Sequence, residues 1–151
     1  LAASADPAIR AQQQRTAWQH TGEDPADLEG SGDALRWWLV HDAVNGRHYR
    51  YAYGVGLKSA NSGYIDQLVK ADVKTGESKI WRERGVYPGE PVFVPRPHPR
   101  GEDDGVIMSV VLDGGRRRSA LVVLDARSME EIARASVPHH IPYGFHGLYA
   151  G

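Results

Sequence analysis

The residues best suited to chemistry lie near the end of the chain, where His146 stands close to two glycines. Gly144 and Gly147 lack a Cβ, so the backbone around this imidazole can pass close to another group. Pro138 and Pro142 restrict φ and remove two N–H donors, which makes the approach to His146 a stiff, extended path. Neutral imidazole is the commonest protein ligand for borderline metals. The local residues leave two interpretations open: a metal ligand, or a buried histidine bonded to a backbone carbonyl.

Five separated blocks of sequence share an order along the chain with a known family. They are residues 51–56 (YAYGVG), 87–97 (YPGEPVFVPRP), 102–106 (EDDGV), 123–126 (VLDA) and 141–147 (IPYGFHG). In this order they resemble the carotenoid cleavage oxygenases, which include the lignostilbene-cleaving dioxygenases and the retinoid isomerase of the retinal pigment epithelium. The resemblance extends from about Asp42 to the end of the chain.

The resemblance implies a seven-bladed β-propeller with an iron(II) ion on its axis, held by four histidines from different blades. His146 falls at the position of the last iron ligand. Glu90 falls at the position of a glutamate that accepts a hydrogen bond from a ligand histidine, a contact that fixes the tautomer and orientation of the ring. Phe145, which precedes the ligand, is a candidate for lining the substrate cavity. None of these residues is expected to act as an acid, a base or a nucleophile.

The activity implied by the resemblance is cleavage of a conjugated carbon–carbon double bond by O₂, with a hydrophobic small molecule as the other substrate. Carotenoid, apocarotenoid and stilbene cleavers share this ending, so three substrate classes stay open. Only one of the four family histidines can be placed, and we expect this chain alone to be inactive. The alternative is an inactive fragment, or a propeller-type interaction module without bound iron.

Composition excludes several other classes of protein. Charged residues make up 25% of the 151 residues and the net charge is −1, so no strong attraction to nucleic acid is expected. There are no cysteines, which excludes disulfides, thiolate ligands and cysteine nucleophiles and favours a cytoplasmic location. No apolar run reaches the length of a membrane span, and nothing in this segment indicates contact with a membrane surface.

The elements that must position these residues are predicted to be strands. Short apolar and aromatic runs with period-two alternation predict strands at residues 49–57, 64–73, 77–83, 90–95, 105–112, 119–126 and 131–137. Residues 85–89 are predicted as a loop, and residues 105–112 as a central strand covered on both faces. The fold class is therefore all-β.

An internal repeat sets the domain organisation. Residues 68–77 (LVKADVKTGE) match residues 121–130 (LVVLDARSME) position for position, each with a strand that ends in Asp, a short turn and a Glu. Repeats built from short strands are typical of propeller blades. We therefore interpret residues 42–151 as about two blades, the C-terminal part of a seven-bladed propeller. Residues 1–41 are polar and poorly matching, and we interpret them as disordered or divergent truncated sequence, or as an out-of-frame product.

The remaining candidates favour structural or solvated roles. His139 and His140 are adjacent on an extended segment and point to opposite faces, so at most one could join His146 in a zinc site. Side chains expected to be solvated are His41, His48, His98 and the arginines at 116–118. The acidic run at 102–104 lacks the alternating pattern of a calcium loop and is expected to be structural.

Overall fold

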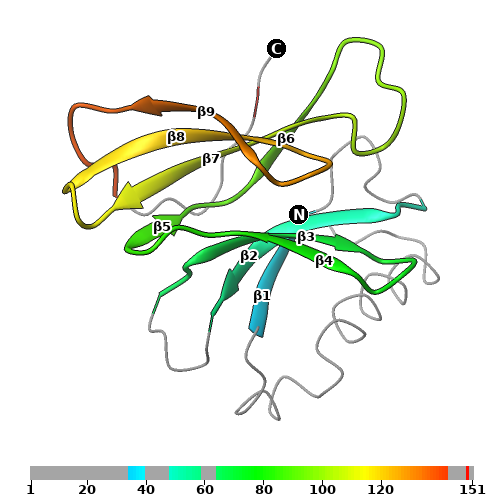
Figure 1. Ribbon diagram of the computed structural model, residues 1–151, viewed down its shortest axis with the longest axis horizontal. Coiled ribbons are helices and arrows are strands. Elements are labelled where there is room, and N and C mark those ends of the chain that lie inside the picture. The colour runs from blue at the N-terminus through cyan, green and yellow to red at the C-terminus, as the bar shows by residue number, and fades with distance from the viewer. Residues whose placement is uncertain (1–33, 40–47, 59–63, 143–148, 150–151) are drawn as a thin grey trace.

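The chain forms two antiparallel sheets, as the computed structural model describes them for residues 34–39, 48–58, 64–142 and 149 (Figure 1). The first sheet has four strands in the order β1-β2-β3-β4, and the second has five, with β5 and β6 both pairing with β7 ahead of β8 and β9. The strands are β1 Ala34–Leu39, β2 Tyr51–Leu57, β3 Gln67–Asp72, β4 Ser78–Trp81, β5 Val86–Pro88, β6 Val92–Pro95, β7 Gly105–Asp113, β8 Arg118–Asp125 and β9 Glu131–Ser136. The described residues contain no helix, so the all-β prediction is confirmed.

The hydrophobic core lies between the two sheets, which Figure 1 shows as stacked layers. Its buried apolar side chains are Tyr53, Val55, Leu68, Trp81, Val86, Ile107, Val111, Ala120, Val122, Leu124, Ala126 and Met129. Across this layer Phe93 of β6 stacks on Tyr53 of β2, with ring centroids 5.6 Å apart. Each large aliphatic side chain buried here contributes about 1.5–3 kcal/mol, so the shared core holds the two sheets together.

β7 is the central strand of the second sheet. It pairs with β5 and β6 along one edge and with β8 along the other, and its burial alternates residue by residue. One face, with Ile107, Ser109 and Val111, is buried against the first sheet. The opposite apolar face is half-buried, and Val110 on it is 41% exposed. The predicted central position is confirmed, whereas the described residues cover only one of the two faces that were predicted to be buried.

The internal repeat corresponds to two turns with the same hydrogen bonds. Asp72 Oδ1 accepts the N–H of Lys74 at 3.0 Å, and Asp125 Oδ1 accepts the N–H of Arg127 at 2.9 Å. In each turn the Asp N–H also bonds to the carbonyl of the residue five positions later, Glu77 or Glu130. Each turn leads from the last strand but one of its sheet, β3 or β8, into the last strand, β4 or β9. The two sheets are therefore two copies of one supersecondary unit, as expected for neighbouring propeller blades.

Two strands differ from the prediction. β5 lies in the segment that was predicted as a loop. The strand was missed because it has only three residues and is flanked by Gly85 and Gly89. β1 lies in the segment left unassigned, and it extends the first sheet by pairing with β2 from Ala34↔Leu57 to Leu39↔Tyr53. The described residues include no helix with the length and apolarity that crossing a bilayer requires.

Candidate metal centre

Glu90 lies at an irregularity in the edge strand of the second sheet. β5 ends at Pro88, which pairs with Val111, and β6 begins at Val92, which pairs with Met108. Residues 89, 90 and 91 therefore face only residues 109 and 110 of β7, one residue more than the ladder can pair. Such a β-bulge re-aims side chains and is over-represented next to active sites. The bulge explains why the predicted strand at 90–95 begins only at Val92.

Two hydrogen bonds fix the backbone of the bulge. The N–H of Gly89 donates to the Val110 carbonyl at 2.8 Å, and Ser109 Oγ donates to the Gly89 carbonyl at 2.9 Å. A Cβ at position 89 would meet the Val110 carbonyl oxygen at 3.1 Å, which is tighter than most Cβ contacts. Gly89 thus permits the close approach of the two strands, and the half-buried Glu90 follows directly from this fixed peptide.

The predicted ligand His146 and the predicted cavity residue Phe145 lie outside the described residues. The segment that leads toward them is described as far as Pro142, and Ser119 at the start of β8 holds it. The Ser119 carbonyl accepts the N–H of Val137 at 2.8 Å, and the Ser119 N–H donates to the His139 carbonyl at 3.2 Å. Ser119 Oγ accepts the N–H of Ile141 at 2.8 Å. The stiff approach that the two prolines predict is thus also anchored to the second sheet.

The other histidines within the described residues are exposed. His139 and His140 are on the surface, as are His48 and His98, so the prediction of solvation is confirmed for His48 and His98. His41 lies outside the described residues. Among the described residues, no three His, Cys, Asp or Glu side chains lie close enough to hold a metal ion. Glu90 is therefore the one member of the predicted site that the described structure contains.

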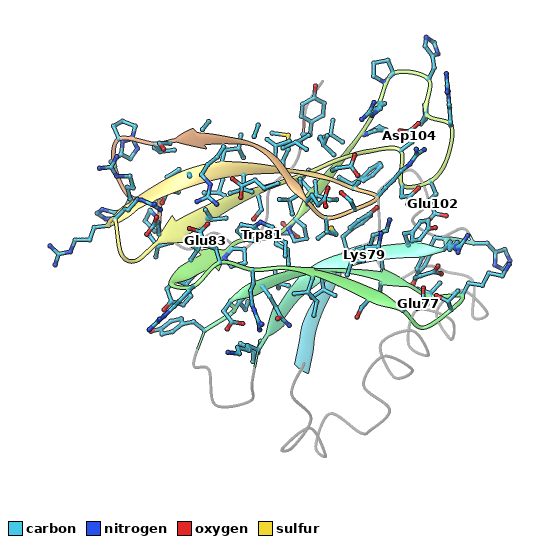
Figure 2. All side chains as sticks on the ribbon, in the orientation of Figure 1. Glu77, Lys79, Trp81, Glu83, Glu102 and Asp104 are labelled. Carbon is cyan, nitrogen blue, oxygen red and sulfur yellow. The ribbon has the colours of Figure 1, made fainter. Side chains whose placement is uncertain are left out.

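The acidic run at 102–104 bonds to protein groups, as its structural interpretation predicts. Both carboxylate oxygens of Glu102 accept the N–H of Arg50 at 2.9 Å, and one accepts the N–H of Tyr51 at 2.8 Å (Figure 2). Asp104 accepts the N–H of Arg100 at 2.9 Å and forms an ion pair with Arg127. These carboxylates join the loop before β7 to the start of β2 and to the turn after β8.

Asp103 forms an ion pair that joins the loop before β7 to β3 and that was not predicted from the sequence. Its Oδ2 lies 2.6 Å from Nζ of Lys70 on β3, and the Lys70 side chain is only 5% exposed. The same ammonium lies 4.1 Å from the centroid of the Tyr51 ring, within range of a cation–π contact. The sequence does carry a signal for this ion pair, namely a single lysine inside the apolar strand 68–71. A lysine that is buried in such a strand needs an acidic partner.

Tyr53 is a further buried polar group beside this ion pair. Its hydroxyl donates to the Ala126 carbonyl at 3.3 Å, and burial raises its pKa well above the usual range. The phenol is therefore neutral at physiological pH and serves to pack Phe93 and cap a carbonyl.

The arginines at 116–118 lie at the tip of the β7–β8 hairpin. All three are exposed, as predicted, but Arg116 also pairs with Asp113 at 2.6 Å and with Glu83 at 3.8 Å. Arg134 of β9 bonds to Glu83 and to Glu131. A hollow of about 420 Å³ beside them is lined by Glu83, Asp113, Arg116, Arg118, Ala120, Arg134 and Ser136. Acidic and basic side chains pair with one another around this hollow, so we interpret it as the site of a surface ion-pair network.

Comparison with known proteins gives a consistent result. The family described as "Retinal pigment epithelial membrane protein" matches residues 9–151. A mitochondrial carotenoid-cleaving dioxygenase of Pongo abelii is 43% identical over 136 residues, covering 89% of this chain and 24% of that protein. A torulene dioxygenase of Fusarium fujikuroi is 42% identical over 111 residues, covering 73% of this chain and 19% of that protein. The chain thus spans about a quarter or less of the length of these relatives.

Solved structures agree with the sequence relatives. A cobalt-substituted apocarotenoid oxygenase of Synechocystis superposes with a TM-score of 0.74 at 32% identity, covering 79% of this chain and 26% of that chain. The expected fold class, part of a propeller, is confirmed. The family match begins at residue 9 and so reaches into residues 1–41, where no resemblance was expected. The domain boundary at residue 41 stays a prediction.

Proposed function

Because this chain belongs to the carotenoid cleavage oxygenase family, we propose that the protein containing it is an iron(II)-dependent dioxygenase. The proposed reaction is cleavage of a conjugated carbon–carbon double bond of a carotenoid, apocarotenoid or stilbene by O₂, giving two carbonyl products. The family match over residues 9–151 carries this proposal. Relatives named as a carotenoid-cleaving dioxygenase, a torulene dioxygenase and a carotenoid isomerooxygenase support it.

In this proposal the chain supplies about two blades of a larger propeller. The half-exposed apolar face of β7 supports this part, because burying such a face against a further sheet stabilises it. The edge strand that carries Glu90 is the one we assign to the propeller channel.

His146 is the residue of this chain that we propose as an iron ligand, one of four imidazoles. A set of neutral imidazoles suits iron(II) and leaves positions open for a small molecule. When bound, the iron supplies the binding and activation of O₂. The described residues fit an iron site in one respect. Glu90 places a half-buried carboxylate at a bulge, and a carboxylate can accept the ring N–H that a ligand imidazole directs away from the metal.

Glu90 then has an orienting role. A carboxylate bonded to one ring nitrogen fixes the tautomer, so the other nitrogen keeps its lone pair for the metal. Phe145 is proposed to line the cavity beside the ligand, where an aromatic ring suits a conjugated hydrophobic substrate. A cytoplasmic location stays a prediction.

The experiment is cleavage of a substrate panel by the complete protein that contains this chain. A carotenoid, an apocarotenoid and a stilbene are each incubated with the iron-loaded protein in the presence and absence of O₂. We expect two carbonyl products from at least one class, only with O₂, and their loss after treatment with an iron chelator. Absence of iron binding together with absence of products from all three classes would contradict the proposal and favour an interaction module.

A further inference from the structure

We infer that Ser109 is a positioning residue for Glu90, an inference that rests on the role proposed for Glu90 above. Ser109 lies in the middle of β7 and is 2% exposed. Its Oγ donates to the carbonyl of Gly89 at 2.9 Å. That carbonyl belongs to the peptide unit that joins Gly89 to Glu90, so the hydroxyl acts on the backbone immediately before the glutamate.

The bulge needs such a constraint. Residues 89–91 have one residue more than the ladder can pair, so the ladder alone does not fix the orientation of the Gly89 peptide. The Gly89 N–H is held by the Val110 carbonyl at 2.8 Å, and the Gly89 carbonyl is held by Ser109. With both its N–H and its carbonyl bonded to β7, Gly89 cannot rotate without breaking a hydrogen bond, although glycine is the most permissive residue. The direction in which the chain enters Glu90 is thereby fixed.

Packing alone does not account for a serine at this position. Residues two apart on a strand share a face, and the neighbours of Ser109 on its face, Ile107 and Val111, are fully buried. A larger apolar side chain would bury more surface there, whereas a buried hydroxyl is costly unless it is bonded. Within the described part of the chain, the Ser109 hydroxyl bonds to the Gly89 carbonyl. The bond to the bulge is thus what the serine contributes.

The expected consequence is a looser metal site when the hydroxyl is removed. Without it the peptide before Glu90 gains freedom, and the carboxylate spends less time in the orientation that bonds the ligand imidazole. Substitutions at residues that orient a metal ligand typically weaken metal binding by about 10–100-fold. Because Ser109 acts one step further away and contributes one neutral hydrogen bond, we expect metal release to be about twofold to tenfold faster.

The test uses the complete protein loaded with cobalt(II), a substitution already made in the related Synechocystis enzyme. Four variants are compared with the parent: Ser109→Ala, Glu90→Gln, the double variant, and Ile107→Val. The first readout is the rate at which a chelator removes cobalt. The second is the visible ligand-field spectrum of the bound cobalt, which reports the geometry of the ligands and which a merely structural role would not change.

Ile107→Val is the matched control. It lies on the same strand and face as Ser109, is also fully buried, and removes one methylene at a cost of stability similar to that of one hydrogen bond. We expect it to leave cobalt release and the spectrum unchanged. We expect Ser109→Ala and Glu90→Gln each to speed release and alter the spectrum, and Ser109→Ala to add nothing in the Glu90→Gln background.

The outcomes separate the two proposals. If Glu90→Gln leaves release and spectrum unchanged, the role proposed for Glu90 is overturned, and the inference about Ser109 with it. If Glu90→Gln speeds release but Ser109→Ala does not, or if the two effects multiply in the double variant, Ser109 acts independently of Glu90. The inference then fails while the proposed function stands.

Discussion

The ion pair between Lys70 and Asp103 makes an asymmetric prediction about stability. Asp103→Asn removes the carboxylate and leaves the Lys70 ammonium, which is only 5% exposed, without its ionic partner. Lys70→Met removes the ammonium but leaves Asp103 with a second cation, Arg127, whose Nε lies 3.7 Å from Oδ1. We therefore expect the aspartate variant to lose much more stability than the lysine variant.

The structure sets the magnitudes. Removing one partner of a buried pair typically costs about 3–5 kcal/mol, because a buried charge is left uncompensated. We expect Asp103→Asn to fall at the lower end, about 3 kcal/mol, since the ammonium keeps its cation–π contact with Tyr51. Lys70→Met keeps the apolar stem against the same ring and should cost about 1 kcal/mol. The double variant should resemble Lys70→Met, which gives a coupling energy of about 3 kcal/mol.

The assay is urea unfolding of the complete protein, followed by tryptophan fluorescence. Trp81 is in the shared core between the sheets and reports on this pair of blades (Figure 2). The free energy of unfolding is measured for the parent, both single variants and the double variant. Equal losses in the two single variants, or additive losses in the double variant, would refute the view that Asp103 is needed because Lys70 is buried.

Two further predictions concern the turns and the loop that join the sheets. Hydrogen bonds from Arg50 lower the pKa of Asp72 from 3.8 to about 2, so the stabilisation is complete above pH 3.8 and is lost as the pH falls toward 2. Asp72→Asn keeps the Oδ1 acceptor of the turn and should remove this part of the pH dependence. If the free energy of unfolding of the variant falls between pH 4 and 2 with the same slope as that of the parent, the prediction is contradicted. Glu102→Ala leaves the N–H groups of Arg50 and Tyr51 without their carboxylate, and should cost about 1–2 kcal/mol in urea unfolding. An unchanged midpoint would show that water replaces the carboxylate.

The fold could be predicted where local chemistry decides it. Asp72 and Asp125 precede turns in which an Asp side chain satisfies backbone N–H groups, and this local signal correctly marked the two repeated units. β5 was missed because its three residues owe their strand conformation to pairing with β7, which lies about twenty-five residues later in the chain. Long-range pairing of this kind leaves little trace in a short window of sequence.

The site could be predicted only in part. Glu90 and His146 were assigned by resemblance, and His146 stays a prediction because it lies outside the described residues. The bulge at Glu90 and the serine that holds it had no local signal, since a bulge exists only relative to its partner strand. Lys70 did carry a signal, but its partner Asp103 lies 33 residues away and only the fold brings them together.

The iron content of the complete protein with His146→Ala shows most directly whether this histidine is an iron ligand. The matched control is His140→Ala, which removes an exposed imidazole from the same segment. We expect the His146 variant to retain almost no iron and to cleave no substrate, and the His140 variant to keep the iron content and activity of the parent. Full iron occupancy in a folded His146→Ala variant would contradict the assignment of His146 as a ligand.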